Sequence, residues 1–286
     1  MKTSTQLKAL IRNLSKKSNV GAEILLRNFM LERFLERMAA SDYKQNFILK
    51  GGMLIAAMVG IDARTTMDMD ATFKGQELTL SEITVMIDKI LQTEIDDGAE
   101  FSLLSIEEIR EESEYPGYRV SISAVFDKTR QTLKIDITTG DCVTPGEIEY
   151  SFKLMFEDRS INIMAYNVET VLAEKFETII TRGVINTRMR DFYDIYILTA
   201  TQKFDMDTFK AALDKTIEKR HTAEQMSEVS VIITTIMGNT IMVRLWQRYQ
   251  KKYFYAADIS WVMVIGAVKS LATFFQNETR SPPLQT

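Results

Sequence analysis

Residues 47–73 read FILKGGMLIAAMVGIDARTTMDMDATF, and this stretch decides the fold. Its first apolar residues predict a short strand, and the double glycine Gly51-Gly52 predicts a turn into an apolar helix. Residues 65–73 then predict a second strand. Asp68 and Asp70 lie two residues apart on it, so their side chains would share one face while the alternating apolar residues take the core face.

Two carboxylates about 6–7 Å apart on one strand face repel each other unless a cation lies between them. A divalent metal that carries a phosphate would satisfy both. Gly51-Gly52, sixteen residues before Asp68, would let a phosphate approach backbone N–H groups without a side chain in the way. The pair alone leaves open that both aspartates are simply solvated on an edge strand, and the glycine turn favours the phosphate site.

The chain of 286 residues suits one large domain or two lobes. A single cysteine, Cys142, excludes a disulfide framework. A single histidine, His221, leaves no His/Cys cluster for zinc and no obvious nucleophile–histidine pair. The chemistry must therefore rest on carboxylates, lysine, arginine and a bound metal. Without a signal-like or membrane-spanning run, we expect a cytoplasmic protein with no membrane partner.

Charge is uneven along the chain. Residues 1–150 carry a net charge of −6, whereas residues 151–286 carry +2. The basic residues of the second half gather in three clusters: Arg182, Arg188, Arg190; Lys215, Lys219, Arg220; and Arg244, Arg248, Lys251, Lys252. A polyanion could lie against such clusters. For any one cluster, a solvated helix face is the simpler interpretation.

The periodicity of the remaining chain predicts helices over 5–40 and 81–91, strands over 101–109, 118–126 and 132–138, and helices from 168 onward. Asp136 lies on the polar side of the last of those strands. If this strand pairs beside 65–73, Asp136 joins Asp68 and Asp70. The alternative is a lone aspartate on a strand surface. Pro145-Gly146 marks a composition shift, which gives domains of 1–145 and 146–286.

Five motifs carry a family resemblance: FILKGGMLIAAMVG (47–60), RTTMDMD (64–70), KID (134–136), VLAEKFETIITRG (171–183) and RMRDFYDIYIL (188–198). The chain resembles the AbiEii-type nucleotidyltransferase toxins of abortive-infection and type IV toxin–antitoxin systems, within the polymerase-beta-like nucleotidyltransferase superfamily. The resemblance implies an α+β fold, with a mixed β-sheet lobe, a mainly helical C-terminal lobe and a cleft between them.

The resemblance also implies roles for individual residues. Asp68 and Asp70 match the metal-binding pair for Mg²⁺ or Mn²⁺, and Asp136 matches a third acid that serves as a base in part of the superfamily. Lys175 matches the lysine that holds the triphosphate, and Asp191 the aspartate that orients it, with Asp194 as a possible substitute. The other residues expected to bind nucleotide are Lys50, Gly51, Gly52, Arg64 and Thr66. Relatives often have serine where this chain has Gly52 or Met53, so a hydroxyl contact to phosphate is lost.

The implied reaction is transfer of a nucleotide from a nucleoside triphosphate to a tRNA 3′ end, which would block translation. An antitoxin encoded nearby is the implied partner. In relatives, a serine or threonine at the place of Thr66 is a phosphorylation point that silences the enzyme, so we expect Thr66 to be a candidate for it. Two alternatives stay open: a protein or small-molecule hydroxyl as acceptor, and a non-catalytic nucleotide-binding protein.

Overall fold

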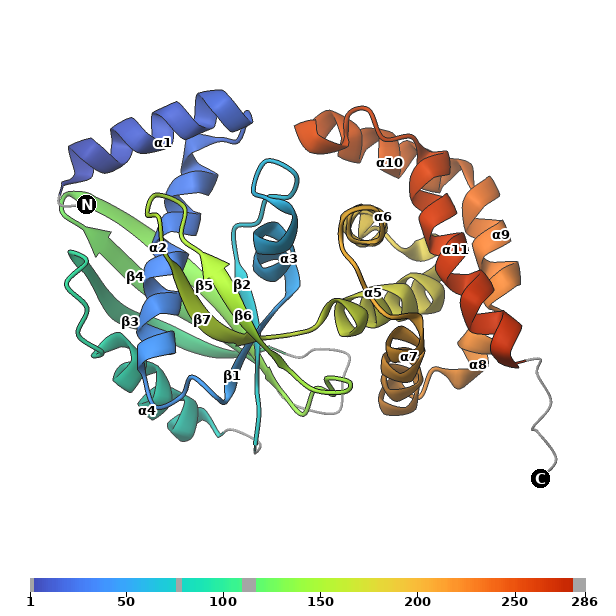
Figure 1. The fold of residues 1–286 in the computed structure, drawn as a ribbon, viewed down its shortest axis with the longest axis horizontal. Coiled ribbons are helices and arrows are strands. Elements are labelled where there is room, and N and C mark those ends of the chain that lie inside the picture. The colour runs from blue at the N-terminus through green and yellow to red at the C-terminus, as the bar shows by residue number, and fades with distance from the viewer. Residues whose placement is uncertain (1–2, 76–78, 110–116, 280–286) are drawn as a thin grey trace. The chain divides into compact units, whose positions relative to one another are not determined.

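The structure is a computed structural model and describes residues 3–75, 79–109 and 117–279. The chain divides into two compact units. Unit 1 comprises Met1–Asp141 and Glu147–Tyr166, and unit 2 comprises Cys142–Gly146 and Asn167–Thr286. Figure 1 shows the helices and strands of both units.

Unit 1 is built on a seven-stranded mixed sheet with the order β3-β4-β5-β2-β1-β7-β6. The strands are β1 (Phe47–Lys50), β2 (Met69–Phe73), β3 (Ala99–Ile109), β4 (Gly117–Phe126), β5 (Thr129–Thr139), β6 (Ile148–Lys153) and β7 (Ser160–Ala165). β2 runs parallel to β5 and antiparallel to β1, and β1 runs parallel to β7. A mixed sheet in unit 1 and a helical unit 2 confirm the predicted α+β class.

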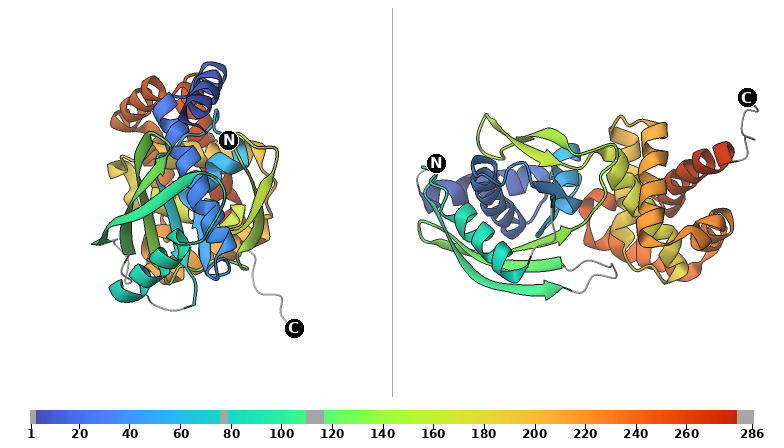
Figure 2. Two further views of the ribbon diagram at one scale, coloured as in Figure 1. Left: turned by 90° about the vertical axis from the view of Figure 1, so that its left-hand side faces the viewer. Right: turned by 90° about the horizontal axis from the view of Figure 1, so that it is seen from below.

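Alternation along the central strands separates an apolar sheet face from a polar one. Met69 and Ala71 of β2 lie beside Ile135 and Ile137 of β5, and all four are fully buried. The helices α2 (Ala22–Ala40) and α4 (Leu80–Leu91) lie on the concave side of the curved sheet, as the right-hand view of Figure 2 shows. The residues that alternate with these apolar ones therefore face the opposite side of the sheet, and Asp70 and Asp136 are among them.

Two more helices complete unit 1. α1 (Ser4–Ser18) packs on α2, and its first residue, Ser4, donates its backbone N–H and its hydroxyl to Asp127 Oδ2. α3 (Gly51–Val59) follows β1 without any intervening loop and packs against β1 and β2. The apolar helix predicted after the double glycine is confirmed, and the glycines lie at the point where a strand becomes a helix.

The division into units follows the sheet rather than the composition shift at Pro145-Gly146. β6 and β7 come after that point in the sequence, yet β7 pairs in parallel with β1. Residues 147–166 therefore belong to unit 1, whereas the sequence alone placed a boundary between 145 and 146. A parallel pairing between strands more than a hundred residues apart leaves no local signal in the sequence.

Unit 2 consists of helices. They are α5 (Val168–Arg182), the 3-10 turn η1 (Gly183–Ile185), α6 (Met189–Thr201), α7 (Met206–Arg220), α8 (Ala223–Ser227), α9 (Val229–Gly238), α10 (Thr240–Lys252), η2 (Phe254–Ala256) and α11 (Trp261–Thr279). α5 contacts α6 and α7, and α11 packs on α6 and α9. Among the described helices, none is by itself long and apolar enough to cross a membrane; α9 and α10 reach that threshold only together, across a bend of 67°.

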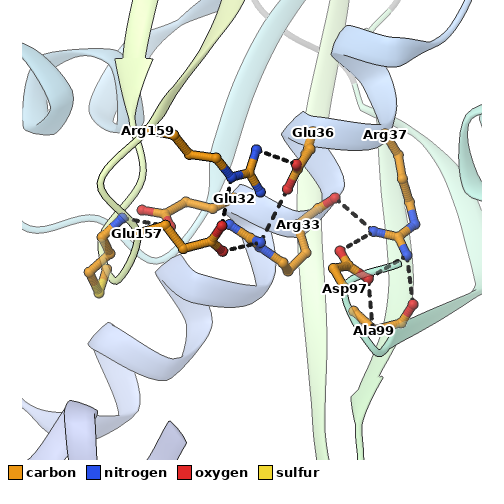
Figure 3. A network of polar contacts seen from close by, with 9 residues as sticks. Glu32, Arg33, Glu36, Arg37, Asp97, Ala99, Glu157 and Arg159 are labelled. Carbon is orange, nitrogen blue, oxygen red and sulfur yellow. Dashed lines mark hydrogen bonds and ion pairs between the residues drawn. The ribbon is translucent and has the colours of Figure 1, made fainter. Parts of the chain in front are cut away.

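A buried network of charged side chains fixes α2 to the turn between β6 and β7 and to the start of β3 (Figure 3). Arg33 Nη1 lies 2.7 Å from Glu157 Oε1 and 3.1 Å from Glu36 Oε2. Arg37 donates to both carboxylate oxygens of Asp97, at 2.7 and 2.9 Å. Paired charges tolerate burial far better than single ones. A shift of α2 along the sheet would separate these pairs, so the network holds the helix in one position.

Glu32 is the member of this network whose protonation changes with folding. Its carboxylate accepts the backbone N–H of Met155 at 3.1 Å, and burial raises its pKa to about 8. Between the ordinary pKa of 4.5 and 8, the folded protein therefore holds a proton that the unfolded chain has released. The contribution of Glu32 to stability is therefore fully present below this window and is lost as the pH rises through it.

We predict that Glu32→Gln removes this pH dependence, because glutamine keeps an acceptor for Met155 and carries no charge. The free energy of unfolding of the unchanged protein should fall by up to about 1.4 kcal/mol per pH unit across the window, while that of Glu32→Gln stays level. Urea unfolding at several pH values measures both. Glu100→Gln, at an exposed position on β3, is the matched control and should behave as the unchanged protein. Parallel curves for Glu32→Gln and the unchanged protein would contradict the prediction.

Candidate active site

The turn from β1 into α3 requires glycine at both positions. Gly51 has a φ of +67°, and a Cβ on it would overlap the carboxylate of Asp70. A Cβ on Gly52 would lie 2.8 Å from Thr66 Oγ1. The double glycine therefore allows Asp70 and Thr66 to pack against the first turn of α3. No side chain caps this helix at its N-cap, Lys50.

A row of four charged residues crosses the polar face of the sheet beside this turn. The register pairs Arg119 of β4 with Asp136 of β5, Asp136 with Asp70 of β2, and Asp70 with Lys50 of β1. Residues paired in this way point to the same side. The sequence left open whether the strand carrying Asp136 lies beside the strand carrying Asp70, and in the structure these two strands pair. The two carboxylates occupy neighbouring positions with a cation on each outer side.

Asp136 is held by Arg119 through two hydrogen bonds. Arg119 Nε donates to Oδ1 at 2.8 Å and Nη2 donates to Oδ2 at 2.7 Å. This pair raises the pKa of Arg119 above its usual range, with a smaller contribution from the nearby charge of Asp68. In this geometry Arg119 occupies both oxygens of the carboxylate that the family resemblance assigns as a base.

The predicted strand over 65–73 is shorter in the structure, because β2 begins at Met69. Side-chain hydrogen bonds replace strand pairing before it: Thr66 Oγ1 donates to the Asp68 carbonyl, and Asn28 Nδ2 donates to the Thr66 carbonyl. Asp68 therefore lies on a bend and is exposed, whereas Asp70 is half-buried. Strand parity therefore places Asp70 but not Asp68.

Arg64 and Thr66 are buried next to the glycine turn, with exposed fractions of 3% and 9%. The Arg64 guanidinium lies near Gly52 and donates to the Thr65 carbonyl. Both residues are thus close to the place where a phosphate would meet the start of α3. Phosphorylation of Thr66 stays a prediction, and it would require the hydroxyl to leave its hydrogen bond to the Asp68 carbonyl.

Lys50 has fixed partners. Its ammonium donates to Thr138 Oγ1 at 2.8 Å and to Asp141 Oδ2 at 2.6 Å. Thr138 Oγ1 also donates to Asp141 Oδ2 at 2.6 Å. Lys50 therefore ties the end of β1 to the residues that follow β5, and it lies beside Asp70 in the sheet register.

In unit 2, Lys175 of α5 is paired with two aspartates of α6. Its Nζ lies 2.8 Å from Asp191 Oδ1 and 2.8 Å from Asp194 Oδ2. The spacing of three residues puts both carboxylates on one side of α6. Burial lowers the pKa of Lys175, but the two aspartates outweigh this effect and raise it above its usual value. The lysine is therefore charged.

The acids of unit 1 fit a magnesium ion that also takes ligands from a substrate. No group of three or more His, Cys, Asp or Glu side chains within the described part of the chain is arranged to hold a metal. Mg²⁺ usually takes one or two carboxylates, several waters and substrate phosphates rather than an all-protein cage. Asp68 and Asp70 supply two such oxygen donors beside the glycine turn.

Sequence reasoning missed Arg119 and Asp141 and gave Asp194 only as a substitute for Asp191. Arg119 had one detectable signal: on an alternating strand next to the strand of Asp136, it takes the polar side. Asp141 had none, because it lies in the loop after β5 and meets Lys50 ninety-one residues away.

Comparisons with known proteins bear on the fold and the family. A candidate nucleotidyltransferase of H. pylori has a similar structure, with a TM-score of 0.52, 14% identity, and coverage of 91% of this chain and 97% of that one. JHP933 from Helicobacter pylori matches with a TM-score of 0.50, 13% identity, and coverage of 91% and 96%. A search of curated protein sequences found no match.

The fold is therefore that of nucleotidyltransferases. The family model described as the nucleotidyl transferase AbiEii toxin of a type IV toxin–antitoxin system matches residues 33–277. The chain belongs to this family and is a nucleotidyltransferase-family enzyme, as the sequence predicted. Membership implies a nucleoside triphosphate as substrate and an antitoxin as partner.

Proposed function

We propose that this enzyme transfers a nucleotide from a nucleoside triphosphate to the 3′ end of a tRNA in a metal-dependent reaction, and thereby blocks translation. The observation that carries the proposal is the placement of Asp70 against Gly51, with Asp136 beside it in register. This arrangement brings carboxylate oxygens next to backbone N–H groups at the start of a helix. A metal-bound triphosphate needs both.

In the proposed reaction, a hydroxyl oxygen of the acceptor forms a bond to the α-phosphorus of the nucleotide. The bond from that phosphorus to its bridging oxygen breaks, and pyrophosphate leaves with the electron pair. Asp68 and Asp70 would hold Mg²⁺ or Mn²⁺, which stabilises the charge developing on the phosphoryl and pyrophosphate oxygens. The N–H groups after Gly51 and Gly52, together with the Arg64 guanidinium, would orient the phosphates.

Lys175 is proposed to hold the triphosphate, with Asp191 and Asp194 keeping its ammonium in place. A lysine that is charged and already fixed by two carboxylates loses little side-chain entropy when it binds an anion. The proton of the attacking hydroxyl is proposed to pass to Asp136. Arg119 already donates to both oxygens of Asp136, so the proton would go to a remaining lone pair of that carboxylate.

We predict that Arg119→Gln strengthens Mn²⁺ binding by roughly tenfold, about 1.4 kcal/mol. The substitution removes a cation close to the acids and frees Asp136 to help bind the ion. Asp136→Asn in the same background should return the affinity to its starting value. Titration followed by electron paramagnetic resonance measures free Mn²⁺ directly. Arg130→Gln, at an exposed position on β5, is the control. An unchanged affinity in Arg119→Gln would show that Arg119 does not restrain the metal site.

The proposed function is tested by incubating the protein with total tRNA, Mg²⁺ and each α-³²P-labelled nucleoside triphosphate in turn, beside Asp68→Ala. We expect label on tRNA with the unchanged protein only. Such a result also identifies the nucleotide, which depends on the shape of the base pocket. Label on protein or on a small molecule would replace tRNA with the other class of acceptor. Label on nothing would favour a protein that binds nucleotide without turnover.

A further inference from the structure

α10 and the turn that follows it present an acid-free basic surface. Residues 240–256 contain four basic residues and no aspartate or glutamate. Arg244, Arg248 and Lys251 are all exposed, and their spacing of four and three residues puts them on one side of the helix. The other side is buried through Met242, Trp246 and Tyr249. We call Arg244, Arg248, Lys251, Lys252 and Phe254 the α10 surface.

The other two basic clusters of unit 2 are of a different kind. In the cluster on α7, Arg220 contacts Glu177 and Lys215 lies 2.7 Å from Glu218, so much of its charge is neutralised. Arg188 and Arg190 come just before Asp191, the first of the two α6 aspartates that pair with Lys175. The aromatic residues next to them, Phe192 and Tyr193, are buried. Within the described residues, no carboxylate forms an ion pair with the four cations of the α10 surface.

An exposed aromatic ring lies at the end of this basic helix. Phe254 is 66% exposed and is the one aromatic residue in the exposed class among the residues whose side chains are described. Its neighbour Tyr253 stacks on Tyr255 with centroids 5.4 Å apart, and Lys252 Nζ lies 5.3 Å from the Tyr253 ring. Tyr249 lies 4.6 Å from Tyr253 and anchors this group of rings to the buried side of α10. An exposed aromatic ring offers a face on which an unpaired base can stack.

We propose that the α10 surface binds single-stranded nucleic acid. Arg244, Arg248 and Lys251 would contact successive phosphates, and an unpaired base would stack on Phe254. Cations alone would fit any polyanion. The exposed ring among them favours nucleic acid over an acidic protein, and an unpaired strand over a duplex, because stacking requires a free base face. This inference rests on the proposed function in one respect: it takes the bound strand to be part of the RNA acceptor.

The test is the fluorescence anisotropy of a 5′-labelled single-stranded RNA titrated with the full-length protein, without nucleotide or metal. Phe254→Ala should weaken binding roughly 5- to 150-fold, which corresponds to about 1–3 kcal/mol for one stacked base. Arg248→Gln/Lys251→Gln should weaken it too, and should lower the slope of log K against log salt by about 0.7 per charge removed. Circular dichroism and thermal melting check that each variant is folded.

Matched controls are Val231→Ala, another exposed apolar residue of unit 2, and Lys215→Gln/Lys219→Gln, which removes two charges from α7. Both should bind RNA like the unchanged protein. Equal weakening by the α7 pair would overturn the proposal. So would equal competition by polyglutamate together with an unaffected Phe254→Ala, since the surface would then recognise charge alone.

The same variants in the labelling assay separate this inference from the proposed function. If the unchanged protein labels tRNA and the α10 variants bind and label it equally well, the inference fails and the proposed function stands. If RNA binding depends on Phe254 and the two cations but no nucleotide is ever transferred to RNA, the inference stands and the proposed function fails.

Discussion

Replacing Asp70 by asparagine should lower nucleotidyl transfer by roughly a thousandfold or more, because metal-assisted charge stabilisation contributes several kcal/mol to such a reaction. Asp70 is the acid that the fold fixes most closely: it is the second residue of β2, it packs against Gly51, and it lies beside Asp136. Asparagine keeps the size and one oxygen of this side chain but removes its charge. Activity should therefore fall while the fold persists.

Two measurements belong together in this experiment. The labelling assay gives the rate of transfer, and a Mn²⁺ titration gives metal affinity independently of turnover. Asp158→Asn, at an exposed position between β6 and β7, removes the same charge elsewhere in unit 1 and should leave both values unchanged. If Asp70→Asn kept its activity, the assignment of Asp70 as a metal ligand would be wrong. A loss of activity together with a lower melting temperature would instead indicate a damaged sheet.

Replacing Lys175 by methionine should reduce both activity and stability. The substitution removes the cation that pairs with both Asp191 and Asp194, and the Asp194 side chain is fully buried. Breaking a buried ion pair from one side typically costs about 3–5 kcal/mol. Urea unfolding should show this loss, and the labelling assay should show no transfer because the proposed contact to the triphosphate is gone.

A compensating variant separates the two effects of Lys175. Adding Asp191→Asn and Asp194→Asn to Lys175→Met removes the uncompensated charges, so stability should recover while activity stays lost. Recovery of both would mean that Lys175 serves only the fold. Unchanged stability in Lys175→Met would mean that water already reaches the cluster, in conflict with the burial of Asp194.

Several features of the site could be read from the sequence because they depend on short-range rules. The double glycine predicted a turn into a helix, and the structure explains it through the positive φ of Gly51 and the closeness of Asp70. The alternation of apolar residues on β2 and β5 predicted which carboxylates turn away from the core. The spacing of Asp191 and Asp194 predicted that they share one side of α6. Each of these follows from backbone geometry within a few residues.

The tertiary structure decided what these residues contact. The exit of Asp68 from the strand depends on Asn28, thirty-eight residues from Thr66. Lys50 meets Asp141 because β1 and β5 lie on either side of β2, and Arg119 meets both oxygens of Asp136 because β4 pairs with β5. The sequence by itself determined the α+β class and the side of the sheet that carries the acids. Strand order and register are long-range properties, so only the folded chain decided which cation neutralises which carboxylate.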